Sequence, residues 1–410
     1  MPPTNLTLAA TSDHNLVAVE VSSQRTVEWV INATAAAAQP NRSPLNIALI
    51  IDRSGSMHGD KLAHVQQATC HVLDQLDARD QVALVAYDDQ VQLLAPSTHV
   101  DQQARDTLKA QINALYPGGW TDLSGGWLAG CREVAAHLHA RAVSRALLLT
   151  DGLANRGITD LEELMHHARE LRQRGVATSA FGVGLDFNEH LLEALAEQGG
   201  GHFYYIAQPG QIPDVFRHEL GELLAVVARE AVLTLKIPAG IAAEVLGGVA
   251  HERNGERLRI FLGDLSAGEQ RAIYTRVLTP PDALGTWLVL RGELGYANLD
   301  GQIVQIATDL AFSYVRETEV RRVPVAEDVL LRASMVELAD AATAALKLER
   351  AGQRHQAQAL LNATLAAAPA MPASTAASYA ALAGRMADGL SEADRKQTHF
   401  AAYRARHGDI

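Results

Sequence analysis

The chain of 410 residues contains only two cysteines, Cys70 and Cys131. Each falls inside a predicted helix, and two thiols at this spacing make neither a disulfide scaffold nor a zinc site. No apolar run approaches the ~20 residues that a membrane span requires. The N-terminus lacks a basic segment followed by an apolar core, so no signal peptide is expected. These absences predict a cytoplasmic protein without a membrane span.

Positive charge is also scarce, because 35 Lys and Arg face 47 Asp and Glu and give a formal net charge of −12. The sequence has no long run of Lys and Arg. This absence and the negative net charge argue against a nucleic-acid partner. A hydrophobic content of 48% with 20% charged residues is ordinary for globular proteins. The chain is too long for one compact core, so two or three domains are expected.

The periodicity of apolar residues divides the chain into four segments. Residues 1–40 read as strands, and residues 44–228 alternate strands with helices, which is typical of a parallel sheet with right-handed crossovers. Residues 229–322 return to period two, with five predicted strands of an antiparallel β-sandwich. Residues 325–410 are alanine-rich and predict a helical bundle. The N-terminal strands are too few to be stable alone. We therefore infer that they complete the sandwich and that the α/β domain is inserted in it.

Oxygen-bearing side chains follow buried strands at three places in the α/β segment. Asp52, Ser54 and Ser56 follow the first apolar run, Thr121 follows two glycines, and Asp151 ends another apolar run. These loops share one edge of the sheet if the intervening segments are helices, and open α/β sheets bind ligands at that edge. Oxygen-only groups at this spacing suit a hard divalent cation, above all Mg²⁺. Taken alone, the Asp-x-Ser-x-Ser segment could equally be an N-capping turn.

The order Asp-x-Ser-x-Ser, Thr, Asp resembles the metal-ion-dependent adhesion site of von Willebrand factor type A domains, over about residues 44–226. The resemblance implies a Rossmann-like, doubly wound domain in which Ser54, Ser56 and often Thr121 contact the metal. Asp52 and Asp151 would act directly or through water. The expected metal is Mg²⁺, with Mn²⁺ or Ca²⁺ as alternatives. Integrin β-chains and bacterial relatives of inter-alpha-trypsin inhibitor heavy chains have a similar layout.

Five protein oxygens would leave one octahedral position open, and an Asp or Glu carboxylate of a protein partner would fill it. We therefore predict a magnesium-dependent protein-binding adaptor that is not an enzyme. The phosphate-binding pattern Gly-x4-Gly-Lys-Ser/Thr is absent. Ser56 and His58 are poorly placed to act as nucleophile and base. Two alternatives stay open, namely a scaffold whose metal only stabilises loops and a magnesium-dependent hydrolase.

Residues beside the predicted site carry further expectations. Trp120 is expected to be exposed and to contact the partner, because aromatic side chains anchor interfaces. Asp88 and Asp89 would be either outer groups of the metal site or a turn cap, and Asp186 a helix cap. Gly118 and Gly119 are expected to allow turn conformations closed to other residues. Lys61 is placed on the following helix, away from any phosphate-clamping position.

Overall fold

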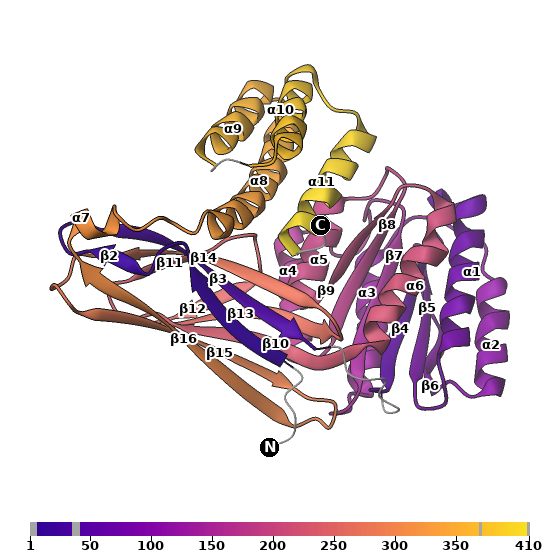
Figure 1. Ribbon diagram of the computed structural model, residues 1–410. Helices are drawn as coiled ribbons and strands as arrows, with labels where there is room; N and C mark the ends of the chain where they lie inside the picture. Colours follow the sequence, from indigo (N-terminus) through magenta and orange to yellow (C-terminus); the bar gives the residue numbers. More distant parts are fainter. Residues whose placement is uncertain (1–5, 35–41, 369–370, 408–410) are drawn as a thin grey trace.

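The computed structural model describes residues 6–34, 42–368 and 371–407 (Figure 1). Within these ranges no helix is long and apolar enough to cross a membrane. The run of alanines and Asn41, which we expect to link the N-terminal strands to the α/β segment, lies outside the described residues.

Residues 45–224 form an α/β unit around a six-stranded sheet with the order β6-β5-β4-β7-β8-β9. Only β6 runs antiparallel to its neighbour. The strands are β4 (Leu45–Asp52), β5 (Gln81–Tyr87), β6 (Val91–His99), β7 (Val143–Thr150), β8 (Ala177–Val183) and β9 (Gly200–Ile206). The helices are η1 (Gly55–Met57), α1 (Asp60–Gln75), α2 (Gln102–Asn113), α3 (Leu123–Ala136), α4 (Leu161–Gln173), α5 (Glu189–Gly199), η2 (Pro209–Gln211) and α6 (Ile212–Leu224).

Helices cover both faces of this sheet. On β4, Ile47 and Leu49 belong to the core shared with α1, α2 and α6. Ala48 and Ile50 belong to the opposite core, shared with α3, α4 and α5. Because both faces are buried, the strand reads as a continuous apolar run rather than an alternating one.

The strands that precede the α/β unit in the chain and those that follow it together form a β-sandwich. One sheet has the order β1-β3-β14-β11 and the other β12-β13-β10-β15-β16-β2. Trp29 of β3 lies opposite Ile273 of β14, and its indole nitrogen donates to Thr275 Oγ1 over 3.0 Å. The strands are β1 (Leu6–Ser12), β2 (Leu16–Ala18), β3 (Ser23–Ala33), β10 (Val226–Lys236), β11 (Ala242–Val245), β12 (His251–Asn254), β13 (Arg257–Ser266), β14 (Gln270–Thr279), β15 (Trp287–Ala297) and β16 (Ile303–Val315).

The remaining chain is a helical tail that packs on the α/β unit through its last helix (Figure 1). Tyr403 of that helix lies in the core of α3, α4 and α5, and its hydroxyl accepts the Phe203 N–H over 3.0 Å. The tail consists of α7 (Glu317–Val320), α8 (Glu327–Arg350), α9 (Arg354–Ala367), α10 (Ala373–Asp388) and α11 (Glu392–His407). The predicted fold class, a doubly wound α/β domain inserted in a β-sandwich and followed by a helical bundle, is confirmed.

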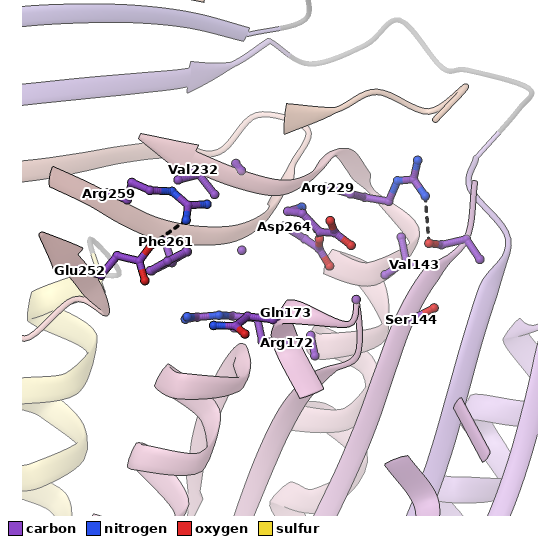
Figure 2. Close-up of a pocket in the computed structure, with 17 residues that line it drawn as sticks. Val143, Ser144, Arg172, Gln173, Arg229, Val232, Glu252, Arg259, Phe261 and Asp264 are labelled. Carbon is purple, nitrogen blue, oxygen red and sulfur yellow. Dashed lines mark hydrogen bonds and ion pairs between the residues drawn. The ribbon is translucent and has the colours of Figure 1, made fainter. Parts of the chain in front are cut away.

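A cavity of about 450 Å³ lies between the α/β unit and the sandwich (Figure 2). It lies at the beginning of β7, the end of the strand opposite to Asp151. Arg172 and Arg259 both stack on Phe261, with guanidinium carbons 4.1 and 5.1 Å from the ring centroid. Arg229 donates to the Ala142 carbonyl over 2.9 Å. The contacts of Arg172 with Phe261 and of Arg229 with Ala142 join the inserted unit to the sandwich.

Candidate metal centre

The three loops predicted to hold a metal meet at the carboxyl ends of β4 and β7. These strands are parallel neighbours, with Ile51 opposite Leu149. From β4 the chain passes to β5 on one side and returns through α3 to β7 on the other side. The site therefore lies at the point where the strand order reverses, which is the usual ligand position in such sheets.

Side-chain oxygens from two of these loops lie within hydrogen-bonding distance. Ser54 Oγ is 3.1 Å from Ser56 Oγ, and Ser56 Oγ donates to Asp151 Oδ1 over 2.6 Å. Asp52 accepts the Ser54 N–H at 2.8 Å and the Thr150 hydroxyl at 2.6 Å. These bonds fix the orientation of both carboxylates.

Asp52 and Asp151 are completely buried. Burial raises the pKa of Asp52 to about 6, although hydrogen bonds from Thr150 and Ser54 oppose the shift. A buried carboxylate is costly unless a cation or several donors compensate it. Two such carboxylates beside three hydroxyl groups fit a divalent cation that prefers oxygen ligands.

Thr121 reaches the same point from the loop before α3. Asn155 holds it, because Asn155 Oδ1 accepts the Thr121 N–H over 2.9 Å. A methyl group at Gly152 would lie 3.3 Å from Ser56 Oγ and 3.6 Å from Thr121 Oγ1. The hydroxyls of Ser56 and Thr121 therefore flank one small space, and the structure brings all five predicted residues together.

Lys61 was missed as part of this site. It lies in the first turn of α1, and its ammonium group is 2.5 Å from Asp151 Oδ2 and 3.2 Å from the Ser56 carbonyl. The signal in the sequence was its position near the amino end of the helix that follows the acidic loop. Lys61 is thus a tethered cation beside one of the buried carboxylates.

The role expected for the two glycines is wrong. Neither Gly118 nor Gly119 has a positive φ. They are required for space instead, since a Cβ at Gly118 would overlap Asp88 Oδ2 and one at Gly119 would lie 2.5 Å from Asp89 Oδ1. The Gly119 carbonyl accepts the Gly55 N–H over 2.9 Å, so the close approach joins two of the three loops.

Two other acidic residues have structural roles. Asp88 Oδ2 forms an ion pair with Arg53 at 3.0 Å, and its Oδ1 accepts the Gln90 N–H in a turn. The helix-cap role expected of Asp186 is wrong, because Asn188 is the residue whose side chain caps α5. The asparagine is one residue before the helix, whereas Asp186 is too far back to reach its free N–H groups.

Exposed apolar side chains occur on loops at the same edge of the sheet as the five residues. The loop before α3 contributes Tyr116 and Trp120, which are 68% and 62% exposed. The loops after β7 and β8 contribute Leu153 and Leu185. We call these four residues the apolar rim. Apolar groups gathered around a polar centre are typical of protein-binding surfaces.

Comparisons with known proteins agree with this fold. Residues 46–218 match the model of the von Willebrand factor type A domain. The chain is 26% identical to protein sll0103 of Synechocystis sp., over 95% of this chain and 94% of that protein. It is 28% identical to human inter-alpha-trypsin inhibitor heavy chain H4, over 49% of this chain and 22% of that protein.

A solved structure described as von Willebrand factor type A from Catenulispora acidiphila has the same arrangement. It superposes with a TM-score of 0.77 at 18% identity, covering 97% of this chain and 96% of that one. Domains of this family are commonly metal-dependent protein–protein interaction modules.

Proposed function

We propose that this protein, whose residues 46–218 form a von Willebrand factor type A domain, is an adaptor that binds a protein partner through a divalent metal. The ligands would be Asp52, Ser54, Ser56, Thr121 and Asp151. The metal would be Mg²⁺, with Mn²⁺ or Ca²⁺ as alternatives.

The observation that carries the proposal is the pair of buried carboxylates, Asp52 and Asp151, beside three hydroxyl groups. All five donors are oxygens, which favours Mg²⁺ over metals that prefer nitrogen or sulfur. Mg²⁺ is six-coordinate. A bound ion would therefore keep a position for a carboxylate supplied from outside the chain.

The apolar rim indicates that the external carboxylate belongs to a protein. Trp120 is the largest of its side chains and follows directly on the glycines that join two metal loops. We propose that Trp120 packs against the partner while an Asp or Glu of that partner reaches the metal. A large aromatic contact of this kind commonly contributes more than 1 kcal/mol to binding.

Adaptor function fits the site better than hydrolysis. The histidine nearest to Ser56 in the sequence is His58, whose Nδ1 lies 2.9 Å from the Gly55 carbonyl. A hydrolase that used Ser56 would need a base within hydrogen-bonding distance of its hydroxyl. That hydroxyl donates instead to Asp151, the carboxylate proposed to hold the metal.

The test is affinity capture from a native lysate, with Mg²⁺ or with a chelator, using wild type, Asp52→Ala and Trp120→Ala. A partner captured only by wild type with Mg²⁺ is the expected result. Trp120→Ala should keep its Mg²⁺ affinity while losing most of the partner. Capture that is indifferent to Mg²⁺ and to both substitutions would favour the scaffold alternative, in which the metal only stabilises loops.

A further inference from the structure

Four ligand-type side chains meet between β9 and α6, away from the proposed magnesium site. His202 and Tyr204 are two residues apart on β9 and share one face of the strand. Glu219 and Glu222 are three residues apart on α6 and share one face of the helix. We call these residues the β9–α6 cluster. Within the described residues, His202, Glu219 and Glu222 form one of two groups that offer three ligand atoms within 4.8 Å of one another.

The distances within the cluster suit a small tetrahedral ion. His202 Nδ1 is 3.0 Å from Glu219 Oε2 and 3.4 Å from Glu222 Oε2. The Tyr204 hydroxyl is 2.8 and 3.2 Å from the same two oxygens. Ligands about 2.0–2.1 Å from a tetrahedral Zn²⁺ lie about 3.3 Å from one another. The two distances from His202 Nδ1 are thus close to the spacing that this ion requires.

Neighbouring side chains fix the orientation of the Glu219 carboxylate. Glu219 is almost completely buried, and its Oε1 accepts the Ser179 hydroxyl over 2.6 Å. Arg145 lies 3.8 Å from that same oxygen. Glu219 Oε2 therefore remains directed at His202 and Tyr204. Outer hydrogen bonds of this kind orient metal ligands in known sites.

The β9–α6 cluster contains two carboxylates, and this negative charge favours the binding of a cation. The nearest guanidinium, Arg145, is paired with Asp264 at 2.8 Å. Arg145 and His218 approach the Oε1 atoms of Glu219 and Glu222, at 3.8 and 3.6 Å. The two Oε2 atoms instead face His202 and Tyr204. A divalent cation between these oxygens and His202 Nδ1 would neutralise both carboxylates.

The other three-ligand group lacks this balance. Glu189 is already paired with Lys396 at 2.9 Å and with Arg350 at 2.5 Å. His190 and His399 in that group therefore face two cations that would repel a metal. In the β9–α6 cluster the neighbouring guanidinium, Arg145, lies farther away, 3.8 Å from Glu219 Oε1, and is paired more closely with Asp264.

An ion can reach the β9–α6 cluster from solvent. A cavity of about 1060 Å³ between the α/β unit, the sandwich and α11 is lined by His202, Tyr204 and Glu222. Glu269 of the sandwich and Phe400 of α11 also line it. The cavity also leaves room for a water molecule on the ion.

We propose that His202, Glu219 and Glu222 bind a second divalent cation of the zinc type, independently of the Asp52 centre. Tyr204 would donate to one of the two carboxylates or occupy the fourth position. Because α6 continues into β10, the ion would tie the end of the α/β unit to β9 close to the sandwich.

The test uses an Asp52→Ala background, so that the proposed magnesium site does not contribute. Equilibrium dialysis against Zn²⁺ should give one ion per chain, and Co²⁺ should show the visible spectrum of tetrahedral coordination. Substitution of an outer-shell residue costs 10- to 100-fold in metal affinity. Loss of a direct ligand, in His202→Ala or Glu222→Gln, should therefore weaken Zn²⁺ binding by at least about 100-fold.

His251→Ala, which removes an exposed histidine from β12, should leave Zn²⁺ binding unchanged. Circular dichroism would establish that each variant is folded, and Glu222→Gln decides the matter if His202→Ala is not. Absence of bound Zn²⁺ in the Asp52→Ala protein would overturn the proposal. Equal affinity of Glu222→Gln and its parent would also overturn it. Neither result depends on whether Asp52 binds Mg²⁺.

Discussion

At the scale of single residues, the proposed magnesium site combines two buried carboxylates, Asp52 and Asp151, with the nearby ammonium group of Lys61. Asp151 is completely buried, and the Lys61 ammonium that contacts it is attached to the first turn of α1. The lysine side chain is about a quarter exposed, so it can move aside into solvent. A metal cation that binds here must either displace this ammonium group or bind against its electrostatic repulsion.

Lys61→Gln should therefore tighten Mg²⁺ binding. The substitution removes a positive charge 2.5 Å from Asp151 Oδ2 and leaves the proposed ligands in place. We expect a gain on the order of tenfold, which corresponds to about 1.4 kcal/mol. Calorimetric titration of both proteins with Mg²⁺ at low salt would measure it. Unchanged or weaker binding would mean that Lys61 does not compete with the metal.

The sequence predicted the convergence of the carboxylates and hydroxyls because each follows a strand of one parallel sheet. It did not predict the contact of Lys61, since a helical register does not show how far a long side chain bends toward a neighbouring loop. The sequence also did not predict that position 118 needs glycine for lack of space. The need for space there arises from Asp88, whose position depends on its ion pair with Arg53.

At the scale of elements, α3 lies unusually close to the central strands. A Cβ at Gly126 would lie 2.5 Å from the Tyr87 ring, and one at Gly130 would overlap Ile50 Cδ1. Both glycines face the sheet, and α3 begins just after Thr121. The depth at which this helix packs therefore helps to set the position of a proposed metal ligand.

Gly126→Ala should destabilise the α/β unit by about 1–3 kcal/mol, because the added methyl group has no space against Tyr87. Gly221→Ala on α6 is the matched control, since a Cβ there meets nothing within 4 Å. That control should be stabilising by up to about 1 kcal/mol. Urea denaturation would compare the two. Equal stability of both variants would contradict the close packing of α3.

The contact of α5 with α11 should depend on pH. Burial and the neighbouring His399 lower the pKa of His190 to about 4. The unfolded chain binds the proton more readily, near the ordinary pKa of 6.5. Stability from this contact is therefore complete above about pH 6.5 and is lost as the pH falls toward 4. His190→Gln should flatten the dependence in this window, and an unchanged slope would exclude His190 as its source.

Regular periodicity predicted the long elements, whereas short ones depended on tertiary contacts. The five strands expected after residue 229 did not include β11 or β12. Each of these has four residues, and those of β12 are all exposed, so no alternation of buried side chains marks it. Both exist through pairing with longer neighbours, β14 and β13.

At the scale of the whole molecule, the tail is docked on the α/β unit through buried charges. Lys396 of α11 is almost completely buried, with its ammonium 2.6 Å from the Phe187 carbonyl and 2.9 Å from Glu189 Oε2. Arg406 of the same helix pairs with Glu193 on α5. The sequence does not predict these contacts, because a charged residue does not reveal a partner two hundred positions away.

Lys396→Ala should destabilise the docked tail by about 3 kcal/mol, because it leaves Glu189 buried with one cation fewer. Lys347→Ala removes an exposed lysine from α8 and should have little effect. Limited proteolysis and urea denaturation of both variants would show whether α11 is released. Equal resistance of the two proteins would contradict this mode of docking.

The insertion of the α/β unit was predictable at this scale, because three N-terminal strands could not form a stable unit alone. Pairing of β3 with β14 supplies the missing neighbour and closes the sandwich across the whole insertion. The docking surface of the tail was not predictable, because it depends on how the insertion is oriented against the sandwich.

The most direct test of the central claim is a calorimetric titration with Mg²⁺ of wild type, Asp52→Ala and Asp186→Ala. Asp186 is an exposed acidic residue near the same edge of the sheet and serves as the control. We predict one Mg²⁺ per wild-type chain, unchanged binding by Asp186→Ala and no measurable binding by folded Asp52→Ala. Wild-type Mg²⁺ affinity in Asp52→Ala would contradict the account.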